Sequence, residues 1–149
     1  MESSQLFLVL WTVLVFWALG QIWFAQIVIY PLFAQVGESE YVRYHRFYLR
    51  RIPLPVIIPG FLCFILPIPL VLYGPAFPVW MNAANVIAGI LGLLVTVLLE
   101  IPRHRRLERA GKDGSVITEL VLYNWPRTLS ISVQSIITFL MLGDAFRNP

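Results

Sequence analysis

The stretch VWMNAANVIAGILGLLVTVLLEI, residues 79–101, decides the fold of this chain. An α-helix needs roughly 20 consecutive apolar residues to cross about 30 Å of hydrocarbon, because each residue adds about 1.5 Å along the helix axis. Residues 79–101 exceed that length, and their only ionisable side chain is Glu100, near the end. The stretch therefore predicts a helix that spans a membrane.

The composition of the whole chain agrees with this prediction. Of 149 residues, 58% are hydrophobic and 13% are charged, whereas a soluble domain carries about 25% charged residues. Residues 1–149 are expected to form a single transmembrane domain, with lipid as the main solvent. The first residues, MESSQ, hold no basic group, and the apolar stretch behind them is longer than a signal-peptide core, which favours a retained membrane helix.

Three further apolar segments reach the spanning length, at about residues 6–33, 54–73 and 116–142. The turn GPAFP, residues 74–78, joins the second and third segments through residues that break helices. The four segments together predict an all-α fold, a polytopic four-helix membrane bundle.

The basic residues predict the orientation of the bundle. Of the 11 Lys and Arg, four lie in RYHRFYLRR, residues 43–51, and five in RHRRLERAGK, residues 103–112. The positive-inside bias makes both segments cytoplasmic and both termini non-cytoplasmic, in the cell (inner or plasma) membrane. Because these basic segments are short and adjoin the membrane, we expect membrane lipid as their partner and no nucleic acid.

The segment between the first two spans, about residues 38–52, has the pattern of an amphipathic helix. Its apolar face has spacings of three and four residues, and Arg43, Arg46 and Arg50 occupy the opposite face. We expect an interfacial helix on the cytoplasmic membrane surface, with His45 directed toward the bundle. The apolar face consists of Tyr41, Tyr44, His45, Tyr48, Leu49 and Ile52.

Four prolines interrupt the second span, at positions 55, 59, 67 and 69. Each proline inside a helix removes one hydrogen bond and clashes with the carbonyl four residues earlier. In lipid, a freed carbonyl must find a partner on a neighbouring helix, a side chain or water. A kinked or partly unwound helix is expected, either as a bend for packing or as a gated opening.

Polar and small residues form a stripe along each of the other spans. Such residues let helices approach closely and bond to one another in a membrane, so we expect the stripes to face the interior. They consist of Trp23, Gln26 and Tyr30 in the first span; Asn85, Gly89, Gly92, Thr96 and Glu100 in the third; and Tyr123, Arg127, Ser130, Gln134 and Thr138 in the fourth.

Arg127 is a permanent cation inside the fourth span. The helical rise places it about 6 Å inside the cytoplasmic edge of a core about 30 Å thick, at the level of Tyr30, His45, Glu100, His104 and Asn124.

Two interpretations of Arg127 stay open. In one, it pairs with Glu100 or Glu119, because an intramembrane charge needs a partner. In the other, it holds an anionic or carbonyl group of a bound molecule. The candidate ligand-binding residues are Arg127, Asn124, Trp125, Glu100 and Gln26.

Several kinds of chemistry find little support in the sequence. No Cys/His spacing of a metal site occurs, the acids are too few for a di-iron bundle, and Cys63 reads as an inert buried thiol. His45 and His104 could hold a haem, but His104 lies in RHRR after Pro102, where a solvated or lipid-facing position is expected. His45, Tyr30 and His104 remain candidate acid–base groups, and no motif implies a cofactor.

Four stretches resemble a family of small, uncharacterised four-span bacterial membrane proteins. They are IWFAQIVIYPLFAQVG (22–37), YHRFYLRRI (44–52), IPRHRRLERAG (101–111) and LYNWPRTLSI (122–131). The family patterns His-Tyr-Pro-Leu-Phe, Pro-x-His-x-x-Leu and Asn-Trp-x-Arg-Thr match here from Tyr30 to Phe33, from Pro102 to Leu107 and from Asn124 to Thr128. The chain departs from the family at Ile29, where histidine is common, and in IIPGFLCF, residues 57–64, which lacks an acid.

A looser similarity in size, span number and an Asn–Arg motif links the chain to anthrone-oxygenase-like membrane proteins. That resemblance implies oxidation of polycyclic aromatic substrates without a conventional cofactor, and it is an analogy at the level of fold.

Three functions follow as hypotheses. The first is a protein that binds a lipid or small lipophilic molecule at the cytoplasmic interface, with Arg127 and Asn124 at its polar end. The second is a membrane oxidoreductase or oxygenase acting on an aromatic or quinone-like substrate, with His45, Tyr30 and His104 handling protons. The third is a structural subunit of a homo-oligomer or of a larger membrane complex.

Overall fold

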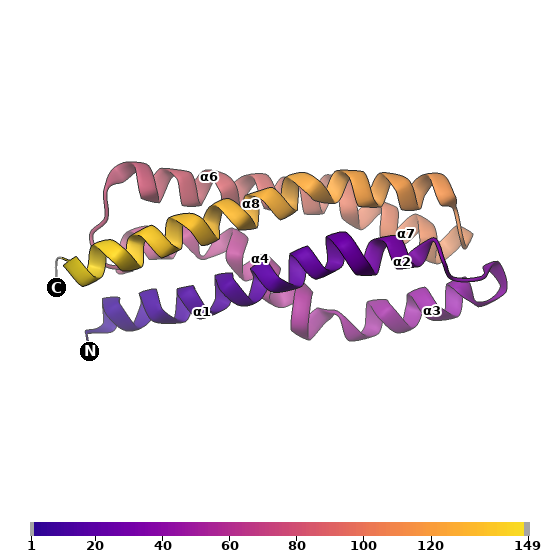
Figure 1. Ribbon diagram of the computed structural model, residues 1–149, viewed down its shortest axis with the longest axis horizontal. Coiled ribbons are helices and arrows are strands. Elements are labelled where there is room, and N and C mark those ends of the chain that lie inside the picture. The colour runs from indigo at the N-terminus through magenta and orange to yellow at the C-terminus, as the bar shows by residue number, and fades with distance from the viewer. Residues whose placement is uncertain (1, 148–149) are drawn as a thin grey trace.

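A computed structural model describes residues 2–147, which form helices and connections without a strand. The ribbon in Figure 1 follows them in chain order. The elements are α1 (Ser3–Phe24), the π-helical segment η1 (Ala25–Ile29), α2 (Tyr30–Phe33), α3 (Glu38–Arg51), the π-helical segment η2 (Pro53–Ile57), α4 (Ile58–Ile65), α5 (Pro67–Tyr73), α6 (Val79–Val95), the π-helical segment η3 (Thr96–Glu100), α7 (Ile101–Ala110) and α8 (Gly114–Arg147).

Three continuous helical runs are long and apolar enough to cross a membrane: Ser3–Phe33, Val79–Ala110 and Gly114–Arg147. They confirm the all-α fold and contain the predicted spans 6–33, 79–101 and 116–142. The predicted span 54–73 is not one straight helix, because η2, α4 and α5 divide it. Glu38–Arg51 and Pro53–Ile65 meet at an angle of 52° across a short break. If these two helices together form one span, the number of crossings is four.

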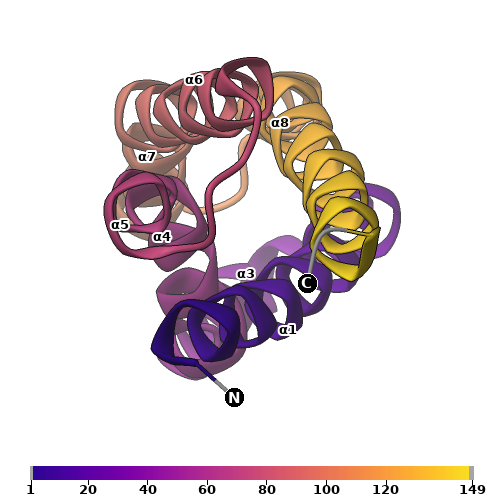
Figure 2. The same cartoon turned by 90° about the vertical axis from the view of Figure 1, so that its left-hand side faces the viewer.

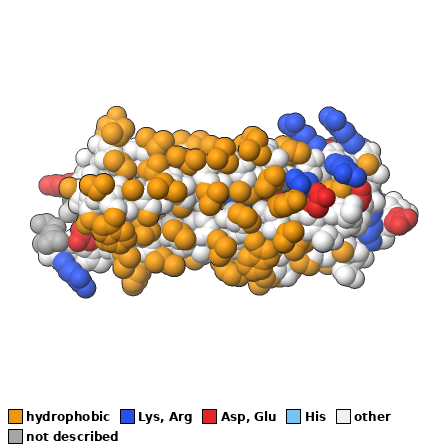
Figure 3. Space-filling model, turned by 90° about the horizontal axis from the view of Figure 1, so that it is seen from above, with side chains coloured by type: hydrophobic (Ala, Val, Ile, Leu, Met, Phe, Trp, Pro, Cys, Tyr) orange, Lys and Arg blue, Asp and Glu red, His pale blue; other side chains and the backbone are white. Residues whose placement is uncertain are grey.

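The long helices run side by side, and the two ends of the chain lie at the same end of the molecule (Figure 1). Seen end on, α1, α8, α6 and the α4–α5 segment stand around a common axis (Figure 2). An apolar band covers the middle of the surface, and charged side chains gather toward the two ends (Figure 3). This distribution suits a molecule surrounded by hydrocarbon at its waist.

Prolines explain where the three π-helical segments lie. The segments end at Ile29, Ile57 and Glu100, and each end is followed two residues later by a proline, at positions 31, 59 and 102. The carbonyl four residues before each proline lies inside the π-helical segment. It loses its helical donor because proline has no N–H, and in a regular α-helix it would clash with the proline ring. A π turn gives that carbonyl more room and keeps the helix continuous.

Side chains of neighbouring helices satisfy two carbonyls that the prolines free. Trp17 Nε1 donates to the Pro55 carbonyl at 2.8 Å, which lies four residues before Pro59. Gln134 Nε2 donates to the Cys63 carbonyl at 2.8 Å, which lies four residues before Pro67. These contacts confirm that the proline-rich segment is bent and that other helices satisfy its backbone, as an apolar solvent requires.

The small-residue stripe of α6 brings α4 close. A Cβ added at Gly89 would lie 2.7 Å from the Phe64 carbonyl oxygen, and one at Gly92 would lie 2.4 Å from the Phe64 ring. The whole predicted stripe from Asn85 to Glu100 is buried. The predicted role of these glycines in close helix packing is therefore confirmed.

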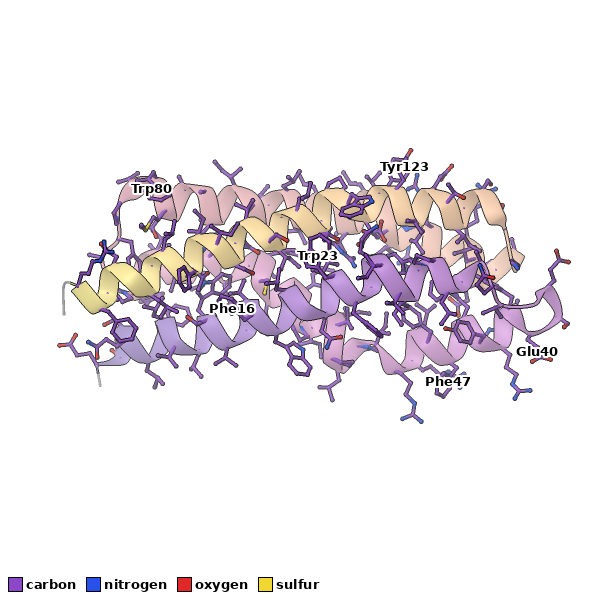
Figure 4. The ribbon with its side chains drawn as sticks, viewed as in Figure 1. Phe16, Trp23, Glu40, Phe47, Trp80 and Tyr123 are labelled. Carbon is purple, nitrogen blue, oxygen red and sulfur yellow. The ribbon has the colours of Figure 1, made fainter. Side chains whose placement is uncertain are left out.

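Helix α3 has the two faces that its sequence predicts. Tyr41 and His45 are buried, whereas Arg43, Arg46 and Arg50 are exposed. Glu40 and Phe47 point away from the other helices (Figure 4). The buried face packs against α2 and α7, so α3 is part of the folded unit and not a free loop.

Two polar contacts fix the connections at the α3 end. Asp113 accepts hydrogen bonds from the Ser115 hydroxyl and from the Val116 N–H, and it thereby caps the first turn of α8. These bonds hold the pKa of the Asp113 carboxyl below its usual range. Lys112 Nζ donates to the carbonyls of Ala34 at 2.8 Å and Val36 at 2.7 Å. The turns after α2 and α7 are thereby tied together.

Replacing Gly89 with alanine tests the close approach of α4. We expect Gly89→Ala to lower the free energy of unfolding by about 1–3 kcal/mol, because the new methyl group meets a backbone atom that cannot rotate away. Gly20→Ala is the matched control, since a Cβ there meets nothing within 4 Å. Thermal unfolding in a mild detergent, followed by tryptophan fluorescence, measures both. Equal unfolding temperatures for the two variants would contradict the packing argument.

Candidate functional site

A cavity of about 220 Å³ lies between the helices, where two apolar clusters meet. Its apolar wall comes from α1, α3, η2, α4 and α8, including Ile22, Leu49, Val56, Phe61 and Ile131. Its polar lining is concentrated on the part of the molecule near α2, α3 and α7. The polar lining residues are Gln21, Tyr30, Tyr48, Thr96, Glu100, His104, Arg105, Glu108 and Arg127.

The sequence places Tyr30 and Glu100 beside the cavity through the π turns. Tyr30 follows η1 directly, and Glu100 is the last residue of η3. Both are buried, with Glu100 only 1% exposed. Arg127 reaches the same wall from α8. Residues from three separated helices therefore converge at one level, as the depth argument predicts.

Arg127 and Glu100 face one another without forming a close ion pair. They interact electrostatically, but among residues 2–147 the ion pairs within 4.0 Å do not include them. Neither oxygen of Glu100 has a hydrogen-bond donor at close distance, although the nearby Tyr30 hydroxyl interacts with it, and Arg127 Nε donates to no atom. Buried ionisable groups whose polar atoms lack hydrogen bonds are costly.

Glu119 does not pair with Arg127. Its carboxylate accepts from Arg103 Nε at 3.0 Å, with the Glu119 side chain 44% exposed. The Arg103 guanidinium also lies over the Tyr123 ring, 4.2 Å from its centre. The expected Arg127–Glu119 pair is therefore wrong, because a closer arginine on α7 takes that carboxylate.

A series of hydrogen bonds runs from Arg127 along the cavity lining and ends at His45, which does not line the cavity. Arg127 Nη2 donates to the Tyr30 hydroxyl oxygen at 3.2 Å. That hydroxyl lies 3.4 Å from His104 Nε2, and His104 Nδ1 lies 3.1 Å from His45 Nε2. Since a hydrogen bond between two ring nitrogens needs a proton on one of them only, the two histidines share one N–H.

Aromatic rings enclose the histidine pair. The rings of His45 and His104 stack with centres 5.4 Å apart, and Phe33 packs edge-on against both. Tyr41 stacks on His45, whose Nδ1 is buried without a partner. The expectation that His104 is solvated or faces lipid is wrong, because its side chain turns inward while Arg105 and Arg106, beside it on α7, are exposed.

Gln26 and Asn124 belong to a separate polar cluster. Asn124 Nδ2 donates to Gln26 Oε1 at 2.8 Å, and Gln26 Nε2 donates to the Val121 carbonyl at 3.0 Å. The Thr128 hydroxyl also lies 3.3 Å from Gln26 Oε1. Their contacts tie η1 to α8. Neither Gln26 nor Asn124 lines the cavity, so the structure does not support their expected role in ligand binding.

Trp125 lies outside the site. It is 38% exposed, and its ring meets Trp23 edge-on with centres 5.8 Å apart. Such a pair on the outer surface suits the belt of aromatic residues that membrane proteins place at the membrane–water interface. It gives Trp125 no contact with the cavity.

Sequence reasoning missed several residues of the cavity. Tyr48 was assigned to the apolar face of its helix, and its position three residues after His45 was the signal that it shares the site. Arg105 and Glu108, on α7, were read as parts of a basic surface. Phe64 carried no signal at all, because its place depends on how α4 packs against the glycines of α6.

Metal binding finds no support in the described part of the chain. Residues 2–147 contain no group of three or more His, Cys, Asp or Glu side chains that could hold an ion. Cys63 is buried in an apolar cluster, in agreement with the prediction of an inert thiol.

Comparisons of the chain with known protein families, with characterised proteins and with solved structures find no match. The resemblance to small four-span bacterial membrane proteins therefore stays a prediction, and the site is interpreted from its own geometry.

Proposed function

We propose that this protein binds a small lipophilic molecule inside the membrane, with the polar end of that molecule at Arg127 and Glu100. The observation that carries this proposal is the cavity of about 220 Å³, which has apolar walls and, in its lining, Arg127 and Glu100 with polar atoms that make no hydrogen bond. Binding sites for small molecules usually combine apolar walls with a few convergent polar groups. The sequence predicts that Asn124 contacts the polar end of the ligand together with Arg127. In this proposal Glu100 and Tyr30 make that contact instead of Asn124.

The cost of these unbonded polar atoms supports a bound partner. Buried ionisable groups in apolar surroundings normally form ion pairs or hydrogen bonds, but Arg127 Nε and both Glu100 oxygens make no hydrogen bond. A ligand that bonds to Arg127 and Glu100 removes that cost, and the energy recovered contributes to its affinity.

Loss of the arginine is expected to release the ligand. The wild-type protein, extracted in a mild detergent, should carry a lipophilic molecule that native mass spectrometry detects. Arg127→Ala should weaken its binding about tenfold or more, because it removes a charge-assisted hydrogen bond. Arg109→Ala, an exposed arginine on α7, is the control and should retain the ligand. A bare wild-type chain, or an Arg127→Ala protein that keeps its ligand, would argue against the proposal.

We further propose that the chain crosses the cell membrane four times, with η2, α4 and α5 forming the second crossing and α3 lying on the cytoplasmic surface. The arginines of α3 and α7 at one end of the molecule, opposite both chain ends, support this orientation. In the other arrangement, residues 53–73 form a re-entrant loop.

Cysteine labelling separates the two arrangements. In a Cys63→Ala background, Ala76→Cys and Ser39→Cys place single thiols at exposed positions on the two sides of residues 53–73. With four crossings, an impermeant maleimide should label Ala76→Cys in intact cells and Ser39→Cys only after permeabilisation. Labelling of both variants under the same condition would indicate a re-entrant loop.

The hydrogen bonds from Arg127 through Tyr30 and His104 to His45 favour a second function. Tyrosine and histidine can pass protons along hydrogen bonds, and the series begins at the cavity wall. A membrane oxidoreductase or oxygenase acting on an aromatic or quinone-like substrate would use this series to accept a proton from the substrate.

Oxidation of a short-chain ubiquinol by dioxygen tests this second function. Quinone and hydrogen peroxide would form together, which accounts for both electrons and both protons of the quinol. We expect His45→Gln and Tyr30→Phe to lower the rate about a hundredfold, since each interrupts proton transfer. Tyr123→Phe is the control, and absence of turnover by the wild-type protein would exclude this function for the ubiquinol.

A further inference from the structure

We propose that the polar end of the ligand is an uncharged hydroxyl group that accepts a hydrogen bond from Arg127 and donates one to Glu100. This inference rests on the proposed lipophile-binding function and names the chemical class of the ligand. It comes from the charges and the unbonded polar atoms around the cavity.

The first argument is the balance of charge. The charged residues that line the cavity are two arginines, Arg105 and Arg127, and two glutamates, Glu100 and Glu108. A carboxylate or phosphate on the ligand would gain from Arg127 but meet the like charge of Glu100. An ammonium group would meet the opposite problem. Bringing like charges together costs free energy in a medium of low dielectric constant. An uncharged polar group on the ligand avoids this cost, because neither side chain repels it.

The second argument is the kind of atom left without a partner. Arg127 Nε is a donor, the two carboxyl oxygens of Glu100 are acceptors, and all three are buried without a close hydrogen-bond partner. The Tyr30 hydroxyl accepts from Arg127 and carries a single proton, for which Glu100 and His104 compete, so it cannot satisfy both Glu100 oxygens. A hydroxyl group supplies one acceptor and one donor on a single atom. An ether or a ketone supplies the acceptor alone and leaves Glu100 unsatisfied.

The third argument is the size and nature of the remaining space. An apolar cavity of about 150 Å³ accepts benzene, so about 220 Å³ accommodates a medium-length alkyl chain or one to two rings. The lining of Ile22, Val56, Phe61 and Ile131 offers no further hydrogen bonds to such a body. The polar end alone therefore sets the chemical specificity.

Four simple molecules with eight carbon atoms test the inference. They are 1-octanol, its isomer heptyl methyl ether, octanoate and octylammonium. The protein is placed in phosphatidylcholine nanodiscs, whose lipid carries no hydroxyl group. The dissociation constant of each molecule follows from the rise in unfolding temperature with its concentration. Comparing wild-type and variant proteins in the same nanodiscs removes differences in partition into lipid.

We expect octanol to bind about tenfold more tightly than the ether, which lacks the hydrogen bond to Glu100. Octanoate and octylammonium should bind more weakly than octanol. Equal affinities for octanol and the ether would overturn the inference and leave the binding function intact. Tightest binding of octanoate would make the site an anion site instead. If none of the four stabilises the protein, the lipophile-binding function itself fails.

A single substitution checks the role assigned to Glu100. Glu100→Gln keeps the size of the side chain and its ability to bond a hydroxyl, but removes the negative charge. It should retain octanol and gain affinity for octanoate by about tenfold. Glu119→Gln, a partly exposed glutamate outside the cavity, is the matched control and should change neither affinity. Unchanged octanoate affinity in Glu100→Gln would contradict the proposal.

The hydroxyl could belong to a glycerolipid or to a free alcohol or phenol. The mass of the molecule that leaves the membrane with the wild-type protein distinguishes these sources. A bound molecule without any hydroxyl group would overturn the inference.

Discussion

Polar groups within an apolar chain must find their partners inside the protein, because hydrocarbon offers none. The prolines make this constraint severe here, since each one frees a carbonyl on the helix that contains it. Trp17 and Gln134 donate to two of those carbonyls from other helices. Segments η2 and α4 thus stay attached to α1 and α8 through bonds that their own interrupted backbone requires. The glycines of α6 permit the close contact with α4.

The candidate site is one of the places where this constraint is not fully met, since other buried side chains, among them Asn85 and Tyr41, also keep polar atoms without hydrogen bonds. Glu100 and Arg127 lie at the cavity, and both keep polar atoms without hydrogen bonds. Nearby, Gln26, Asn124 and Thr128 form a cluster in which most polar atoms are bonded. This difference is the reason that we propose ligand binding at Glu100 and Arg127 and not at the cluster of Gln26 and Asn124. Composition alone cannot make this distinction, because the same residue types occur in both.

The depth of the site along the helices was largely predictable from the sequence. Helical rise is nearly constant, so residue counts placed Tyr30, Glu100 and Arg127 at one depth, and the structure brings them together. The direction of the side chains was less predictable. Gln26 and Tyr30 are four residues apart and would share a face of a regular α-helix, but the π turn of η1 changes their relation. Asn124 lies one turn before Arg127 and is rotated toward α1, where Gln26 binds it.

The sequence by itself determined that this chain is helical, that its long helices suit a membrane, where polar stripes run and where prolines disturb the backbone. These properties depend on local periodicity, length and the chemistry of the peptide unit. Only the tertiary structure decided which arginine Glu119 binds, that His104 turns inward to His45, and that a cavity remains beside Glu100 and Arg127. Those outcomes depend on the rotation and bending of whole helices relative to one another, and small changes in the width of a turn alter both.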